Sequence, residues 1–96
     1  MSSLSVMVKR FRVIFSGHVQ GVGFRYTSKQ VSRSFDVVGT VRNLANGTVE
    51  LICECERPTA QEFIKEIGHS THGRVADSTV EELDATGEFA GFEIVR

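Results

Sequence analysis

The chain of 96 residues lacks tryptophan, has one proline and two cysteines, and contains no long hydrophobic run. Without an apolar stretch of about 20 residues, we expect no transmembrane helix. The first eight residues also lack the charged start and apolar core of a secretion signal, which favours a cytoplasmic location. The formal net charge is −1, so the sequence predicts no general attraction to nucleic acid or to an acidic membrane.

Repeats, linkers and low-complexity segments are also missing, and the length suits a single domain. We expect a tail over residues 1–8 and a domain over residues 9–96. Cys53 and Cys55 stand two apart in a strand-like run, so they face the same side and a disulfide between them would be strained. A metal site needs more ligands than this pair supplies. We therefore expect half-buried, reduced thiols, with no metal and no cofactor.

The hydrophobic pattern predicts two helices and five strands. Alternation or β-branched residues predict strands over 10–15, 37–44, 48–54, 74–83 and 92–95. Helical spacing predicts helices over 24–35 and from Pro58 to a stop at Gly68. This order is the split βαβ, or ferredoxin-like, α+β fold, with one antiparallel sheet, two helices on one face and a short C-terminal strand. The core candidates are Phe11, Phe15, Phe24, Phe63 and Phe92.

This connectivity brings two distant segments together. The first and second strands run in the same direction with the third between them, so their C-terminal ends share one edge of the sheet. A glycine-rich loop leaves the first strand there, and Asn43 ends the second. Asn43 and Val41 are two apart and share a face. If Val41 packs under the helices, Asn43 points toward the loop.

Three glycines and an arginine make the segment 17–25, Gly-His-Val-Gln-Gly-Val-Gly-Phe-Arg, the most informative in the chain. Glycines let successive backbone N–H groups turn toward one point, and a helix N-terminus adds unpaired donors. Arg25 adds a planar cation that can bind two oxygens at once. The combination suits a phosphoryl group. The candidate phosphate-binding loop comprises His18, Val19, Gln20, Gly21, Val22, Gly23 and Phe24, with Gly17 as a structural glycine before it.

Other phosphate motifs do not fit this segment. A Walker A loop fails because Val22 stands at its second glycine, and a dinucleotide fingerprint fails because Tyr26 stands at its third. The loop has no cysteine nucleophile. No acidic residue lies between Arg12 and Asp36, which argues against a loop-borne magnesium site or carboxylate base. What remains is a metal-free anion cradle with one arginine.

These residues resemble the acylphosphatase family. Segment 17–25 is similar to the family signature, Gly39-Thr40-Val41-Arg42-Asn43 with Gly47-Thr48-Val49 is similar to its second motif, and Gly91-Phe92-Glu93-Ile94 to its last strand. The similarity runs from about Lys9 to Arg96. It implies that the loop amides and Arg25 hold phosphate and that Asn43 positions the attacking water. Thr40 stands where the family usually has a large aromatic residue, which bears on local packing and substrate fit.

The resemblance implies hydrolysis of small acyl phosphates, and the chemistry of the loop agrees with it. A carboxylate, whose conjugate acid has a pKa of about 4, can leave without a protein acid. His18 is the one candidate acid in the loop, and we favour a loop role for it. Every proposed group comes from one chain, so a monomer can act alone.

One other function stays open, that of a domain that binds phosphate without turning it over. Modules that bind RNA share this fold plan, but outward-facing Glu50 and Glu54 on the third strand would repel a phosphate backbone, so the sequence argues against RNA binding.

Overall fold

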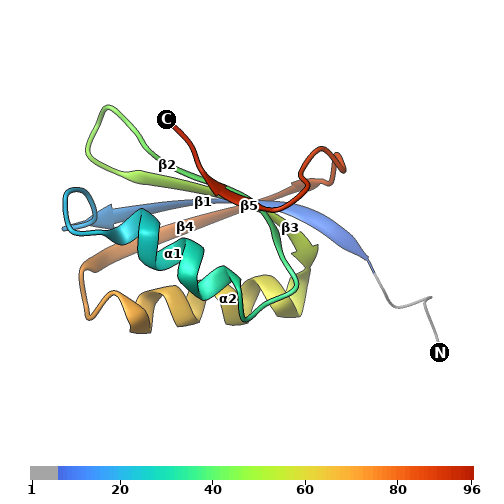
Figure 1. Cartoon of the computed structure of the whole chain (residues 1–96), viewed down its shortest axis with the longest axis horizontal. Coiled ribbons are helices and arrows are strands. Elements are labelled where there is room, and N and C mark those ends of the chain that lie inside the picture. The colour runs from blue at the N-terminus through green and yellow to red at the C-terminus, as the bar shows by residue number, and fades with distance from the viewer. Residues whose placement is uncertain (1–6) are drawn as a thin grey trace.

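A computed structural model describes residues 7–96. Residues 1–6 of the expected tail lie outside the described residues, and Val8 already belongs to a strand. The strands are β1 (Val8–Gly17), β2 (Val38–Asn43), β3 (Val49–Glu56), β4 (Val75–Asp84) and β5 (Phe92–Ile94), and the helices are α1 (Phe24–Ser32) and α2 (Arg57–Ser70). Figure 1 shows both helices on one face of the sheet, which confirms the expected ferredoxin-like arrangement.

The sheet has the strand order β4-β1-β3-β2-β5. Both β1 and β2 pair antiparallel with β3, so they run in the same direction and end at the same edge, as predicted. The prediction of a purely antiparallel sheet is wrong, because β5 pairs parallel with β2. Strand β4 is antiparallel to β1, and the chain reverses over residues 85–91 before it reaches the opposite edge. That reversal gives β5 the direction of β2.

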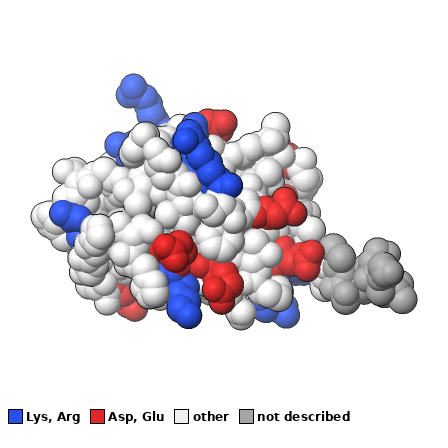
Figure 2. Space-filling model, turned by 60° about the horizontal axis from the view of Figure 1, so that its bottom comes forward, with Lys and Arg blue, Asp and Glu red and all other residues white. Residues whose placement is uncertain are grey.

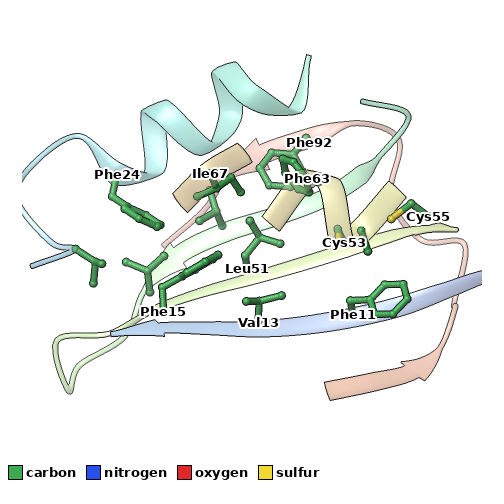
Figure 3. Packing of buried hydrophobic residues seen from close by; sticks show 14 residues of the cluster. Phe11, Val13, Phe15, Phe24, Leu51, Cys53, Cys55, Phe63, Ile67 and Phe92 are labelled. Carbon is green, nitrogen blue, oxygen red and sulfur yellow. The ribbon is translucent and has the colours of Figure 1, made fainter. Parts of the chain in front are cut away.

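The core lies between the helices and the sheet. All five predicted phenylalanines are buried in it, and so are Cys53 and Cys55, which are free thiols. The thiols are more deeply buried than expected because α2 covers their face of β3. Figure 3 shows Phe24, Phe63 and Ile67 of the helices directed at Phe15, Leu51 and Val13 of the sheet. This packing fixes where α1 begins, and α1 begins at the end of the glycine loop.

The C-terminal ends of both helices differ from the prediction. Helix α1 stops at Ser32, and Phe35 follows in tight turns in which the Ser34 and Phe35 amides donate to carbonyls three residues earlier. Helix α2 continues through Gly68 to Ser70, so the predicted stop at Gly68 is wrong. No neighbouring atom crowds Gly68, and the helix simply tolerates it. No helix among residues 7–96 is long and apolar enough to span a membrane.

The helix-free face of the sheet holds two buried carboxylates. Glu50 is 5% exposed and accepts hydrogen bonds from Arg12 Nε at 2.6 Å and Arg42 Nε at 2.7 Å. Glu54 is 4% exposed and accepts from Arg10 Nε and from backbone amides of the β4–β5 loop. The sequence predicts that these carboxylates face outward and carry unpaired charges that repel a nucleic acid. In the structure their charges are neutralised instead.

Burial alone would raise the pKa of Glu50, but the hydrogen bonds from Arg42 and then Arg12 outweigh it and hold the pKa below its usual value. The folded protein therefore releases this proton more readily than the unfolded chain, whose glutamates titrate near about 4.3. The stabilisation is complete above that pH and is lost as the pH falls through the folded pKa. Glu54 shows the same direction, against the same effect of burial, through its bonds to Thr86, Gly87 and Arg10.

We predict that Glu50→Gln lowers the free energy of unfolding at pH 7 by about 1–3 kcal/mol, because two charge-assisted hydrogen bonds weaken. Below about pH 4.3, the free energy of unfolding of the variant should also decrease less than that of wild type. Urea unfolding at several pH values measures both. Glu62→Gln, at an exposed position of α2 that makes no ion pair among residues 7–96, is the control. Parallel pH curves for Glu50→Gln and wild type would contradict the assignment.

Candidate functional site

Strand β1 ends against the start of β4, and this contact sets where the glycine loop begins. Gly17 has a φ of 119°, and a Cβ there would lie 2.5 Å from the Arg74 carbonyl oxygen and 2.6 Å from the Ala76 nitrogen. The next amide, of His18, donates to the Arg74 carbonyl at 2.9 Å. His18 is therefore anchored through its backbone, its amide is taken, and its side chain is exposed.

Beyond His18 the loop bends through two glycines with left-handed backbones. Gly21 and Gly23 each have a φ of 76°, and nothing lies within 4 Å of a Cβ built on either. Backbone conformation, rather than crowding, requires glycine here. Gly23 is the N-cap of α1, no side chain caps this end of the helix, and its first turn has no acidic residue.

The amides of the loop and of the first helical turn have no protein partner. Within residues 7–96, no backbone or side-chain acceptor takes a hydrogen bond from any amide between Val19 and Tyr26. The first amide with a partner is that of Thr27, which donates to the Gly23 carbonyl at 2.9 Å. A run of unpaired N–H groups at a helix N-terminus attracts an anion through donors and dipole together.

A cavity of about 160 Å³ lies beside these amides. It is bounded by the loop, the first turn of α1, the end of β2 and β5, and its lining residues are Val19, Gly21, Gly23, Phe24, Arg25, Tyr26, Asn43 and Ile94. A larger hollow of about 470 Å³ lies over Thr27, Gln30 and Glu66. That hollow carries a carboxylate and no cation in its lining, so it does not suit an anion.

Arg25 and Asn43 bring unsatisfied groups to the small cavity. Arg25 is half-buried and forms no ion pair with any carboxylate of the described chain. Asn43 Oδ1 is buried and has no hydrogen-bond partner among residues 7–96. A buried acceptor without a donor costs about 1–3 kcal/mol. A donor that enters the cavity, such as water, would relieve that cost.

The side chain of Gln20 has a role that the sequence did not reveal. Its Nε2 donates to the carbonyl oxygens of Leu44 and Thr48, each at 2.8 Å, across the neck of the β2–β3 hairpin. Sequence reasoning assigned Gln20 only a backbone amide in the loop. Its partners are carbonyl groups, which every residue carries, so no residue type in the sequence signals the contact.

Six of the ten predicted site residues line the cavity, namely Val19, Gly21, Gly23, Phe24, Arg25 and Asn43. Gly17 and His18 anchor the loop to β4, Gln20 reaches the hairpin, and Val22 packs against the core. Thr40 is half-buried in β2 and alternates with Val41 and Asn43, so it faces the opposite side of the sheet. Its departure from the family pattern therefore falls outside the cavity lining.

The remaining surface offers no competing cationic patch on the face that Figure 2 draws, where basic and acidic side chains are interspersed. The described residues also contain no group of three or more His, Cys, Asp or Glu side chains placed to hold a metal ion.

Comparison with known proteins gives consistent matches over nearly the whole chain. The acylphosphatase family model matches residues 11–94. An acylphosphatase from Treponema denticola is 41% identical over 83% of this chain and 86% of its own length, and one from Paenarthrobacter aurescens is 40% identical over 90% and 93%. The crystal structure of acylphosphatase from Bacillus subtilis superposes with a TM-score of 0.84 at 32% identity, covering 94% of this chain and all of that one.

The close approach at Gly17 yields a stability prediction. Gly17→Ala should lower the free energy of unfolding by more than about 2 kcal/mol, because the methyl group meets the β4 backbone at a disfavoured φ. Gly68→Ala is the matched control, since its position is helical and open, and it should raise stability by roughly 0.5–1 kcal/mol. Urea unfolding of the two variants measures both effects, and equal stabilities would refute the account of Gly17.

Proposed function

The chain belongs to the acylphosphatase family, and we propose that its cavity hydrolyses the carboxyl–phosphate bond of small acyl phosphates without a metal. The activity is the one that its relatives are named for. The observation that carries the proposal is the juxtaposition of three kinds of unsatisfied group at one cavity: the amides of the segment from Val19 to Tyr26, six of whose residues line it, the Arg25 guanidinium and the Asn43 side chain. None of them has a protein partner among residues 7–96, and together they match the polar needs of a phosphoryl group and a water.

The phosphoryl group is held by the loop. The three non-bridging oxygens of the phosphoryl group accept hydrogen bonds from amides of the segment from Val19 to Tyr26. The guanidinium of Arg25 donates two parallel hydrogen bonds to two of these oxygens. Phosphoryl transfer spreads charge over these oxygens, so donors already oriented toward them stabilise the transition state with little rearrangement. His18 contributes no amide to this cradle, because its N–H already donates to Arg74.

The attacking water is held by Asn43. The water donates one hydrogen bond to the buried Oδ1. This bond holds the water next to the phosphorus atom, on the side opposite the leaving carboxylate. A water bound in this way has already lost the translational and rotational entropy that a free water would lose on reaching the phosphorus. The O–P bond to the acyl group then breaks in line, and the electron pair leaves with the carboxylate.

The leaving group explains why the cavity needs no acid. The residues that line it include no Asp, Glu, His, Cys or Lys, so the lining supplies no carboxyl or imidazole acid for a departing alkoxide and no anionic ligand for a cation. Its one phenol, Tyr26, is exposed and accepts a hydrogen bond from Gln30 Nε2. A carboxylate departs without protonation because its conjugate acid has a pKa of about 4. The substrate's own phosphate accepts the proton that the water loses. Acyl phosphates are thus favoured over phosphate esters.

A monomer in the cytoplasm suits this function. Every group of the cavity comes from one chain, so a second subunit is not needed to complete it. Cys53 and Cys55 are both free and buried, which fits a reducing compartment. The partners of the protein are then an acyl phosphate and inorganic phosphate, with no nucleic acid and no membrane among them.

We predict that the protein releases phosphate from benzoyl phosphate in the presence of a chelator. Arg25→Ala and Asn43→Ala should each lower kcat/KM by about 10³-fold or more, since one removes the charge on the phosphoryl oxygens and the other the water's acceptor. Arg33→Ala, an exposed arginine just beyond the other end of α1, should keep the wild-type rate. A phosphomonoester should be hydrolysed far more slowly. Near-wild-type rates for both site variants would refute the mechanism.

Binding of phosphate can be tested apart from turnover. At about ten times its dissociation constant, inorganic phosphate should stabilise wild type by about 1.4 kcal/mol, a rise in Tm of roughly 6–11 °C. The rise should disappear in Arg25→Ala and persist in Arg33→Ala and Asn43→Ala, because Asn43 serves the water and not the anion. A full rise in wild type without hydrolysis of any acyl phosphate would instead favour a domain that binds phosphate and does not turn it over.

A further inference from the structure

We propose that Gln20 is a positioning residue, whose side-chain amide sets the distance between the phosphate-binding loop and the asparagine that holds the water. This inference rests on the function proposed for Arg25 and Asn43. It assigns to Gln20 a task that its place in the loop does not reveal, because the side chain turns away from the cavity and toward the β2–β3 hairpin.

The contact joins the two halves of the site almost directly. Both N–H groups of the Gln20 amide are used, one on the Leu44 carbonyl and one on the Thr48 carbonyl, each at 2.8 Å. Leu44 is the residue after Asn43, and Val49, the residue after Thr48, is the pairing partner of Asn43 across the ladder. The amide thus attaches to both arms of the hairpin, one residue beyond the pair that contains the residue that holds the water.

The hairpin end of this contact is rigid. The Leu44 amide donates to Thr48 at 2.9 Å, the Gly47 amide donates back to Leu44, and Asn46 Oδ1 accepts from both the amide and the hydroxyl of Thr48. The Asn46-Gly47 turn is therefore closed by its own bonds. It offers a fixed pair of carbonyls to which the loop can be tied.

The loop end has few other restraints. Between the His18 amide, bonded to Arg74, and the Thr27 amide, bonded to Gly23, no backbone amide has a protein partner in the described chain. Val19 and Phe24 are buried and hold the two ends of the loop at the core. Within residues 7–96, the Gln20 amide forms the only hydrogen bonds that link residues 18–26 to β2, β3 or their hairpin.

A primary amide is the neutral side chain that offers two donors on one nitrogen. Leucine has a similar size but no donor, so each carbonyl would keep only its backbone donor, Gly47 N–H for Leu44 and Leu44 N–H for Thr48, and the link to the loop would be lost. Glutamate would set an ionised carboxylate against two carbonyl oxygens, and protonation would return a single O–H donor. Displacement of the loop relative to Asn43 by about 1 Å is enough to lower a rate by about 10²-fold.

The experiment compares Gln20→Leu and Gln20→Glu with wild type on benzoyl phosphate, after urea unfolding confirms that each variant is folded. We expect Gln20→Leu to lower kcat by roughly 10–100-fold. The inhibition constant of inorganic phosphate should stay within about twofold of wild type, because the amides of the loop and Arg25 still hold the anion. In an Asn43→Ala background, Gln20→Leu should lower kcat by less than about twofold, because the residue that Gln20 positions is already absent.

The glutamate variant adds a readout in pH. The ratio of the Gln20→Glu rate to the wild-type rate should rise several-fold as the pH falls from 8 to 5, because the protonated carboxyl regains one hydrogen bond to the hairpin. The same ratio for Gln20→Leu should be flat, since leucine does not titrate. Residue 20 is the one change between each variant and wild type, so a difference between the two profiles reports on its side chain.

Three results would overturn the proposal. One is a wild-type kcat for Gln20→Leu while Arg25→Ala and Asn43→Ala are inactive, which would leave the proposed function intact. Another is a parallel loss of kcat and phosphate affinity, or the same loss in the Asn43→Ala background, which would make Gln20 a support of the loop alone. The third is failure of both variants to fold, which would make the amide a requirement of folding. Full activity of Arg25→Ala and Asn43→Ala would instead remove the proposed function itself.

Discussion

A row of unpaired backbone amides is the feature on which the rest of this structure depends. Folded proteins pair nearly all of their buried N–H groups, so a loop that leaves several amides without a protein acceptor pairs them with water or with a ligand. Here the segment from Val19 to Tyr26 stays open because its two ends are fixed: His18 is bonded to β4, and Phe24 is packed in the core. The two left-handed glycines, Gly21 and Gly23, both line the cavity beside these amides.

The sheet topology supplies the other side of that cavity. Because β1 and β2 both pair with β3, the loop that leaves β1 and the residue that ends β2 are separated by the width of one strand. Strand β3 is buried on both faces, by the helices over Leu51 and by arginines over Glu50. Because β3 is held on both faces, it fixes the distance between the glycine loop and Asn43.

Periodicity predicted most of this fold, and its failures have physical causes. Strands and helices that bury one face repeat with a period that shows in the sequence, so their order and the five core phenylalanines could be predicted. The end of α2 could not, because Gly68 stops a helix only where tertiary contacts favour another path. The direction of β5 depends on how residues 85–91 cross the sheet, which no local pattern encodes.

The site divides in the same way. Arg25, Asn43 and the glycines could be predicted as a group because their residue types carry the chemistry. Gln20 was missed because its partners are main-chain carbonyls of Leu44 and Thr48. The burial of Glu50 was missed because alternation marks a face of the strand but does not say that arginines of the neighbouring strands fold over it.

The charge of Arg25 is left uncompensated in a chain of net charge −1, in which four other arginines are paired with carboxylates. Arg10, Arg12, Arg42 and Arg57 each hold a carboxylate, so their fields are largely cancelled at short range. Arg25 has no such partner in the described chain, and no carboxylate lines its cavity. The positive ends of the loop amides and of α1 add to its field at the same point. The charge of Arg25 and the partial charges of these amides thus act together at the cavity where we propose that a phosphoryl group binds, although the protein as a whole carries no excess of positive charge.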